Sequence, residues 1–161
     1  MKFLLTAINT KYIHSNLAIY SLKAYHESKG GIADVEIAEF TINQYVDDYI
    51  REIYKRKPDV IAVSCYLWNI EYVYECACEL KKIMPDMDIW LGGPEVTYDS
   101  VSVLKKHPYI KGVMIGEGEE TFTQLCNVYF NGYNCKNEYF DINFINDKLR
   151  TVNGISINID G

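Results

Sequence analysis

The stretch Ile89-Trp90-Leu91-Gly92-Gly93-Pro94-Glu95 is the clearest structural signal in this chain, because a short apolar run stops there at two glycines and a proline. Such a run predicts a buried β-strand. Glycines have no Cβ atom, so a large flat ligand could lie directly against the strand end, and proline blocks further sheet pairing. We therefore expect Gly92 and Gly93 to form the floor of a binding site.

Two other apolar runs end in a similar way. Val60-Ile61-Ala62-Val63 continues into Ser64-Cys65-Tyr66-Leu67-Trp68-Asn69, and Val113-Met114-Ile115 continues into Gly116-Glu117-Gly118-Glu119-Glu120. The carboxyl ends of parallel strands lie at one edge of a sheet. The three strand ends are therefore expected to converge on one site.

Hydrophobic periodicity predicts an alternation of strands and helices along most of the chain. Parallel strands need crossover connections, so this order favours an α/β fold: a doubly wound, five-stranded parallel sheet of the flavodoxin-like or Rossmann-like type. Ligands bind such sheets outside the carboxyl ends of the strands, where the winding direction reverses. The predicted strands are residues 2–8, 35–40, 60–63, 89–91 and 111–115, and the predicted helices are residues 16–28, 46–57, 71–84, 97–106 and 119–130.

The last part of the chain has a different character. Residues 131–147 are rich in Asn, Tyr and Asp without a clean period, and residues 151–161 are typical of a strand, a turn and a second strand. We therefore expect an α/β domain over residues 1–132, followed by a linker and a short β-hairpin over residues 133–161. A hairpin that stops at a turn signal lacks its closing partner, so the chain is expected to be the front portion of a longer protein.

Composition excludes several classes of partner. The chain has 161 residues, of which 48% are hydrophobic, and this is enough for one well-buried domain. A net charge of −6 without any Lys/Arg run argues against nucleic acid or an anionic membrane. No apolar run is long enough to cross a bilayer, so we expect a cytoplasmic protein. Five cysteines without Cys-x3-Cys-x2-Cys or zinc-type spacing predict reduced thiols.

Four segments together resemble a known family. They are residues 9–16 after the first strand (Asn-Thr-Lys-Tyr-Ile-His-Ser-Asn), residues 58–64 leading into Tyr66, residues 91–95 (Leu-Gly-Gly-Pro-Glu), and residues 116–122 (Gly-Glu-Gly-Glu-Glu-Thr-Phe). The chain resembles, over nearly its whole length, the amino-terminal cobalamin-binding domain of cobalamin-dependent radical S-adenosylmethionine proteins. This group includes the oxidative cyclases of magnesium-porphyrin synthesis.

The resemblance implies that this chain binds a corrinoid and does not catalyse a reaction alone. The corrin ring would lie over the strand ends, with the nucleotide tail directed to the Ser64 turn and the glycine floor. The iron–sulfur cluster and S-adenosylmethionine would belong to a downstream radical domain of the same chain, whose cysteine triad is absent here, in a methyltransferase or cyclase-like enzyme. Strand-end geometry and the resemblance together assign these residues to the cofactor: Asn9, Thr10, Tyr12, His14, Ser15, Asn16, Ser64, Tyr66, Leu67, Trp68, Gly92, Gly93, Pro94, Glu95, Gly116, Glu117, Gly118 and Glu119.

One departure separates this chain from the cobalamin-dependent methionine synthases and mutases. Those proteins carry Asp-x-His-x-x-Gly after the first strand, which supplies a histidine to cobalt. His14 here lacks both the aspartate and the glycine, so the carboxylate that would orient the ring by accepting from its other nitrogen is missing. The resemblance is therefore to the radical-enzyme members, which commonly bind cobalamin without a protein histidine on cobalt.

Several of these residues also fit purely structural roles. Ser15 or Asn16 fits a helix cap, Ser64 a turn, and the glycine pair a tight bend. Glu119 fits the first turn of a helix, where acidic residues offset the macrodipole.

Two other functions remain open from the residues alone. One is a cofactor-free flavodoxin-like interaction or regulatory domain, in which Tyr66-Leu67-Trp68 dock a partner. The other is a nucleotide or flavin binder, which the lack of Gly-x-Gly-x-x-Gly in the first β-α turn disfavours.

Overall fold

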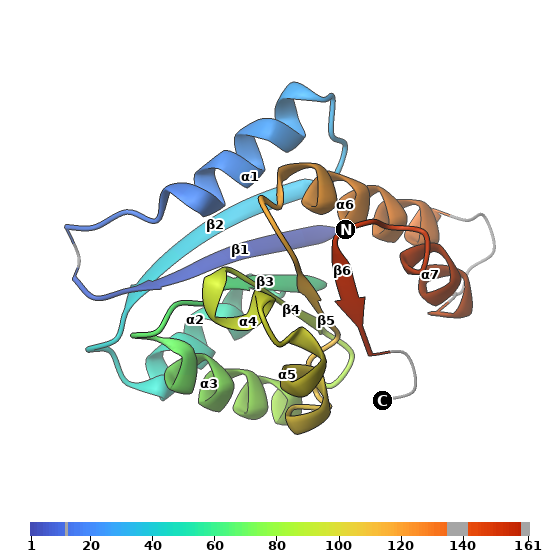
Figure 1. The fold of residues 1–161 in the computed structure, drawn as a ribbon. Helices are drawn as coiled ribbons and strands as arrows, with labels where there is room; N and C mark the ends of the chain where they lie inside the picture. Colours follow the sequence, from blue (N-terminus) through green and yellow to red (C-terminus); the bar gives the residue numbers. More distant parts are fainter. Residues whose placement is uncertain (12, 135–141, 159–161) are drawn as a thin grey trace.

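The computed structural model describes residues 1–11, 13–134 and 142–158. A single six-stranded sheet in the order β2-β1-β3-β4-β5-β6 forms the centre of the molecule (Figure 1). The strands are β1 (Lys2–Asn9), β2 (Asp34–Thr41), β3 (Val60–Ser64), β4 (Asp88–Gly92), β5 (Gly112–Met114) and β6 (Ile155–Ile157). The helices are α1 (Leu17–Ser28), α2 (Val46–Arg56), α3 (Ile70–Ile83), α4 (Pro94–Thr97), α5 (Ser100–Lys106), α6 (Glu119–Asn134) and α7 (Ile142–Leu149).

The first five strands are parallel, as the sequence predicts, and β6 is antiparallel to β5. Central strands of a parallel sheet are covered on both faces, so they consist of uninterrupted apolar residues. β3 follows this rule from Val60 to Val63, and the polar Ser64 that ends the strand is buried as well. The predicted doubly wound α/β fold is therefore confirmed, with a sixth strand added at one edge.

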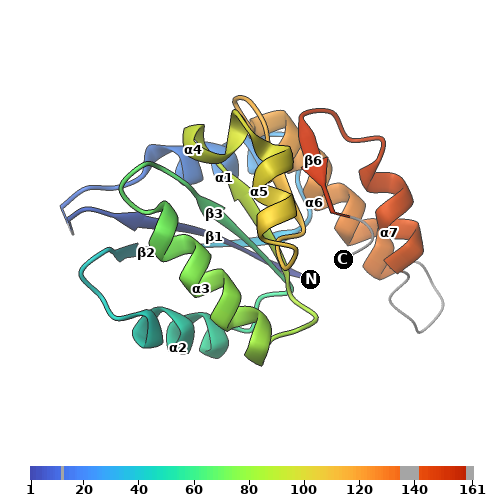
Figure 2. The ribbon, with the colours of Figure 1, turned by 60° about the horizontal axis from the view of Figure 1, so that its bottom comes forward.

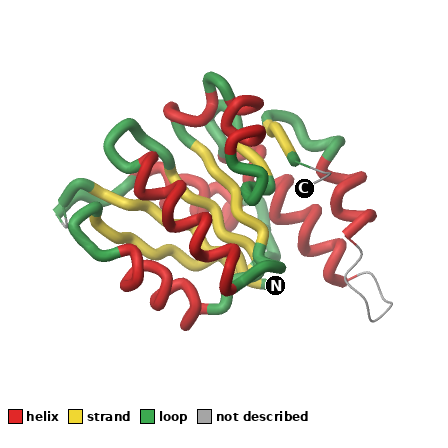
Figure 3. The backbone as a smooth tube through the Cα atoms, turned by 90° about the horizontal axis from the view of Figure 1, so that it is seen from below, coloured by secondary structure: helices red, strands yellow, loops and turns green. Residues whose placement is uncertain are grey.

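The helices cover both faces of the sheet. Helices α1 and α6 pack together on one face, and α7 packs on α6 (Figure 1). Helices α2 and α3 pack together on the opposite face, where Figures 2 and 3 show them in front of the strands. The molecule is thus a three-layer α/β/α structure.

Each face of the sheet has its own hydrophobic core. Leu4, Ile61 and Leu91 belong to the core under α2 and α3, whereas Phe3 and Trp90 belong to the core under α1 and α6. Strand residues alternate between the two cores because successive side chains of a strand point to opposite faces.

A chain of two hydrogen bonds crosses the core under α6. Trp90 Nε1 donates to the Tyr129 hydroxyl at 3.0 Å, and that hydroxyl donates to Asp88 Oδ2 at 2.5 Å. The polar atoms of two large buried rings are thereby satisfied.

The winding direction reverses between β1 and β3. From β1 the chain passes through α1 to β2 at one edge, and from β3 it passes through α3 towards β4 and the other edge. The two neighbouring strands therefore send their connections to opposite faces, which opens a crevice at their carboxyl ends. Asn9 ends β1 and Ser64 ends β3, so both residues lie at this crevice.

The carboxyl-terminal part differs from the expectation. Residues 151–154 form turns instead of the first arm of a hairpin, and residues 155–157 form β6, paired with β5. The last three residues of the expected hairpin region, 159–161, lie outside the described residues. Helix α7 was not expected, and the predicted helix over residues 97–106 is divided into α4 and α5.

Candidate functional site

A narrow slot of about 120 Å³ opens at the carboxyl ends of the strands. Its sheet side is formed by apolar residues such as Leu5, Ala62 and Met114, and its other wall by α1 through Ala18 and Leu22. The predicted site residues that line it are Ser64, Tyr66, Gly92, Gly93, Gly116, Glu117 and Gly118. Residues from β3, β4 and the loop after β5 therefore do converge, and they meet at α1.

The two glycines of the predicted floor have different neighbours. A Cβ atom on Gly92 would lie 3.5 Å from Met114 Cε, an ordinary contact, so Gly92 leaves space on the slot side. A Cβ atom on Gly93 would lie 2.5 Å from the Cys65 carbonyl oxygen. The space beside Gly93 is therefore filled by the protein's own backbone. Only Gly92 of the pair leaves space for a ligand.

Ser64 and Asn16 form a polar contact at the slot. Asn16 Nδ2 donates to Ser64 Oγ at 3.0 Å, while Asn16 Oδ1 accepts from the Ala18 backbone N–H at 3.1 Å. Asn16 is thus the N-cap of α1 and also a link between α1 and β3. Because the Ser64 oxygen accepts from Asn16, its own proton is available for a ligand.

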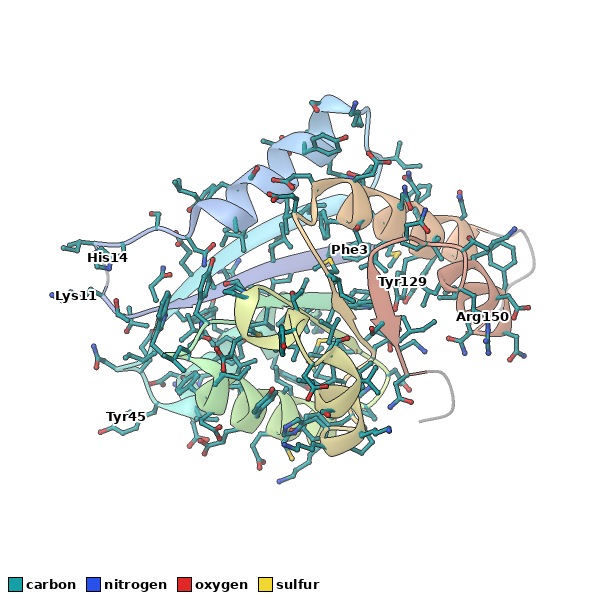
Figure 4. All side chains as sticks on the ribbon, viewed as in Figure 1. Phe3, Lys11, His14, Tyr45, Tyr129 and Arg150 are labelled. Carbon is teal, nitrogen blue, oxygen red and sulfur yellow. The ribbon has the colours of Figure 1, made fainter. Side chains whose placement is uncertain are left out.

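The loop between β1 and α1 lies at the same edge of the sheet. Asn9 Nδ2 donates to the His14 carbonyl oxygen at 2.8 Å, and Thr10 Oγ1 is hydrogen-bonded to His14 Nδ1 at 3.3 Å. Figure 4 shows Lys11 and His14 projecting beyond the strand ends. Ser15 is exposed, and Tyr12, also predicted to contact the cofactor, lies outside the described residues.

Glu39, near the end of β2, was not among the predicted site residues. Its Oε1 accepts from the Asn16 backbone N–H at 2.8 Å and from Asn9 Nδ2 at 2.9 Å, and its Oε2 accepts from the Tyr20 hydroxyl at 2.8 Å. Burial alone would raise the pKa of this carboxyl, but hydrogen bonds led by the Asn16 N–H lower its pKa overall. The sequence signal that could have identified Glu39 is the position of a carboxylate near the carboxyl end of a predicted strand.

The loop between β3 and α3 presents a flat aromatic surface. The Tyr66 and Trp68 rings are stacked, with centroids 4.6 Å apart and planes 6° from parallel. Trp68 is 51% exposed, and Leu67 is 79% exposed. The buried Asn69 was also missed: its Oδ1 accepts from the Tyr66 N–H at 2.8 Å, and its Nδ2 donates to the Ser64 carbonyl at 3.0 Å, which holds this loop in place.

The remaining predicted residues are less directly at the slot. Glu119 Oε1 accepts from Ser21 Oγ at 2.8 Å, and the neighbouring Glu120 Oε2 accepts from the Tyr25 hydroxyl at 2.8 Å. Both contacts join α6 to α1 beside the slot. Pro94 begins α4, and Glu95 follows it; both are exposed.

Among residues 1–11, 13–134 and 142–158, no three His, Cys, Asp or Glu side chains are placed to hold a metal ion. Burial raises the pKa of the Cys76 thiol to about 12, which makes it a poor nucleophile at neutral pH. No helix within these ranges is long and apolar enough to span a bilayer.

An apolar slot at the switch point of a flavodoxin-like sheet defines a Rossmann-like ligand-binding domain. More specifically, the chain belongs to the B12 binding domain family, whose family model matches residues 4–126. The resemblance drawn from the four sequence segments is thereby confirmed.

Individual relatives support the same assignment. The cobalamin-dependent radical SAM methyltransferase TokK of Streptomyces tokunonensis is 38% identical over 69 residues, 43% of this chain and 10% of that protein. The anaerobic magnesium-protoporphyrin IX monomethyl ester cyclase of Rubrivivax gelatinosus is 32% identical over 100 residues, 60% of this chain and 18% of that protein. The chain spans between a tenth and a fifth of the length of these relatives.

The fold also matches a solved structure. The cobalamin-dependent S-adenosylmethionine radical enzyme OxsB, with aqua-cobalamin and S-adenosylmethionine bound, superposes with a TM-score of 0.72 at 17% identity. The match covers 97% of this chain and 20% of OxsB. At this identity the likeness supports the fold alone.

Proposed function

We propose that this chain binds a corrinoid with the nucleotide tail in the slot and the corrin ring over the strand ends. The slot between α1 and the sheet is the observation that carries this proposal. Its volume of about 120 Å³ is below the roughly 300–1,000 Å³ of pockets that enclose a whole ligand. It therefore fits one flat part of a larger ligand and leaves the rest outside.

The character of the slot suits a nucleotide base. Its walls are largely apolar, through residues such as Leu5, Ala18 and Met114, and Ser64 supplies a hydroxyl. A heterocycle buries its faces against such walls and needs only one or two polar partners. Outside the slot, the stacked Tyr66 and Trp68 rings offer apolar cover for part of the macrocycle.

We further propose that the bound corrinoid serves a radical S-adenosylmethionine domain in the same protein. Bound cobalamin supplies methyl-transfer or radical chemistry, whereas the residues described here bind and orient it. The iron–sulfur cluster and S-adenosylmethionine would belong to the other domain, as the relatives' names and lengths support. Free, buried thiols such as Cys65 and Cys126 support a reducing, cytoplasmic location.

The experiment that tests the tail position is a titration with hydroxocobalamin, followed by absorbance, on Ala18→Phe and Ala24→Phe. Both alanines are exposed on α1, but Ala18 lines the slot and Ala24 does not. We expect Ala18→Phe to weaken binding at least about tenfold, roughly 1.4 kcal/mol, and Ala24→Phe to bind like wild type.

Cobinamide, which lacks the nucleotide tail, is the matched ligand for this titration. It should bind wild type and Ala18→Phe equally, because it does not need the slot. Equal weakening of both ligands by Ala18→Phe would contradict the tail position.

A second candidate is a cofactor-free interaction domain. The specific observation in its favour is the exposure of Leu67 at 79% and Tyr98 at 99% at this edge of the sheet. The same titration separates the two functions, because this candidate requires that wild type bind neither corrinoid.

A further inference from the structure

Glu39 is the point at which the loop between β1 and α1 is attached to the sheet. Its Oε1 accepts from the Asn16 N–H at 2.8 Å and from Asn9 Nδ2 at 2.9 Å. Asn9 Nδ2 also donates to the His14 carbonyl at 2.8 Å, so both protons of this amide are used. One carboxylate thus holds both ends of the segment between residues 9 and 16.

The partners of Glu39 are neutral donors. The ion pairs of the described residues do not include Glu39, although the same strand carries Glu36, which pairs with Lys2 at 2.7 Å. Tyr20 contributes a third donor, from its hydroxyl to Oε2 at 2.8 Å. Hydrogen bonds to an ionised acceptor are about twice as strong as neutral ones, so Glu39 holds Asn9 and Asn16 firmly against the end of β2.

The loop that Glu39 holds is connected directly to the slot. Asn16 donates its backbone N–H to Glu39 Oε1, caps α1 by accepting the Ala18 N–H at its Oδ1, and donates from its Nδ2 to Ser64 Oγ at 3.0 Å. A shift of Asn16 would therefore move the Ser64 hydroxyl. It would also move the first turn of α1, where Ala18 lines the slot. The path from Glu39 to the slot passes through one residue.

We infer that Glu39 is a positioning residue for corrinoid binding: it holds the β1–α1 loop and Asn16 in the binding-competent arrangement before the ligand arrives. This inference rests on the proposed function. The competent fraction of the free protein multiplies the apparent association rate constant. Loss of Glu39 therefore slows association and leaves dissociation unchanged, whereas loss of a direct ligand contact speeds dissociation.

The test is stopped-flow binding of hydroxocobalamin to wild type, Glu39→Ala, Glu39→Gln and Glu36→Ala. We expect Glu39→Ala to slow association about tenfold, the effect of one charge-assisted hydrogen bond. Glu39→Gln should recover part of the rate, because its amide oxygen still accepts from Asn16 and Asn9. Glu36→Ala is the matched control on the same strand, and it should associate like wild type.

Amide hydrogen exchange of the ligand-free proteins gives an independent readout, in which the Asn16 N–H should exchange faster in Glu39→Ala than in Glu36→Ala. If Glu39→Ala does not fold, Tyr20→Phe removes one donor to the same carboxylate at an exposed position. Water can replace that donor, so association should slow by only about twofold. An association rate constant equal to that of the control, or a change in dissociation alone, would overturn this inference. Failure of wild type itself to bind would instead overturn the proposed function, and this inference with it.

Discussion

Gly93 has a backbone conformation that only glycine adopts easily. Its φ of 110° and ψ of 171° lie in a region that is essentially restricted to glycine, and its missing Cβ makes room for the Cys65 carbonyl. The neighbouring Cys65 N–H donates to the Gly92 carbonyl at 2.7 Å, so the ends of β3 and β4 are joined here. The residue is therefore needed for the shape of the site, whatever the site binds.

This difference between the two glycines is measurable. Gly93→Ala should lower the free energy of unfolding by about 1–3 kcal/mol from backbone strain, with a further cost from the Cys65 contact. Gly92→Ala should change it by less than about 1 kcal/mol, because its Cβ would make only an ordinary contact. Urea unfolding of both variants checks this expectation. Equal destabilisation by the two substitutions would contradict it.

His26 is a buried residue whose charge state affects folding. The ring is fully buried on α1 and contacts Phe122 edge-to-face, with centroids 5.9 Å apart. Burial lowers the pKa of His26 from the ordinary 6.5, because the charged ring loses its hydration. Between the lowered pKa and 6.5 the unfolded chain binds more protons than the folded one, so stability falls as pH falls through this range.

We therefore expect the free energy of unfolding to decrease from pH 7.5 to pH 5.5, and His26→Leu to make the decrease smaller. His107 also has a pKa lowered by burial, so part of the dependence should remain. The exposed Ala24 on the same helix provides the control, since Ala24→Leu changes no titrating group and should keep the full dependence. Urea unfolding at both pH values is the measurement, and an unchanged slope in His26→Leu would argue against this role.

At the scale of elements, α7 extends the hydrophobic core that lies between the sheet and helices α1 and α6. Ile145 and Leu149 are fully buried and belong to the same core as Phe3 and Trp90. Gly132 in α6 permits this approach, because a Cβ there would lie 2.5 Å from Ile145 Cγ1. The described part of residues 133–161 is thus packed on the α/β unit, while the domain boundary at residue 132 stays a prediction.

Ile145→Ala should therefore destabilise the whole chain, by about 2–5 kcal/mol, through loss of buried surface and creation of a cavity. Asp147→Ala on the exposed side of the same helix should change stability by less than about 0.5 kcal/mol. A single unfolding transition that moves to lower urea in the first variant is the expected result. A small effect of Ile145→Ala would mean that α7 is only loosely attached.

At the scale of the whole molecule, the fold was predictable because its central strands are locally distinctive. The apolar run from Val60 to Val63 and the glycine pair after Leu91 are each signals contained within a few consecutive residues. By contrast, β6 exists only because β5 offers it an antiparallel edge, a contact more than 40 residues away in sequence. Helix α7 was hidden because it is only eight residues long and asparagines at positions 143 and 146 interrupt its apolar residues.

The site residues that could be predicted are those that the strand order alone brings together. Ser64 and Gly92 end neighbouring strands, so their meeting at the slot follows from strand order. The role of Glu39 depends on a loop that folds back over β2, and the separate roles of the two glycines depend on where Cys65 lies. Such side-chain contacts are not encoded in periodicity. Direct cofactor contact stays a prediction for every residue assigned to it.

A ligand that binds the folded chain but not the unfolded chain raises Tm by an amount that can be calculated. A ligand at one hundred times its dissociation constant stabilises the folded state by about 2.7 kcal/mol. For a chain of 161 residues, where each kcal/mol raises Tm by about 2–4 °C, hydroxocobalamin should raise Tm by roughly 5–11 °C. Ala18→Phe should lose most of this shift at the same ligand concentration, while Ala24→Phe should keep it. Flavin mononucleotide should give none, because the first β-α turn lacks a phosphate-binding glycine loop. A comparable shift with the flavin would favour a flavodoxin-type ligand and argue against the corrinoid.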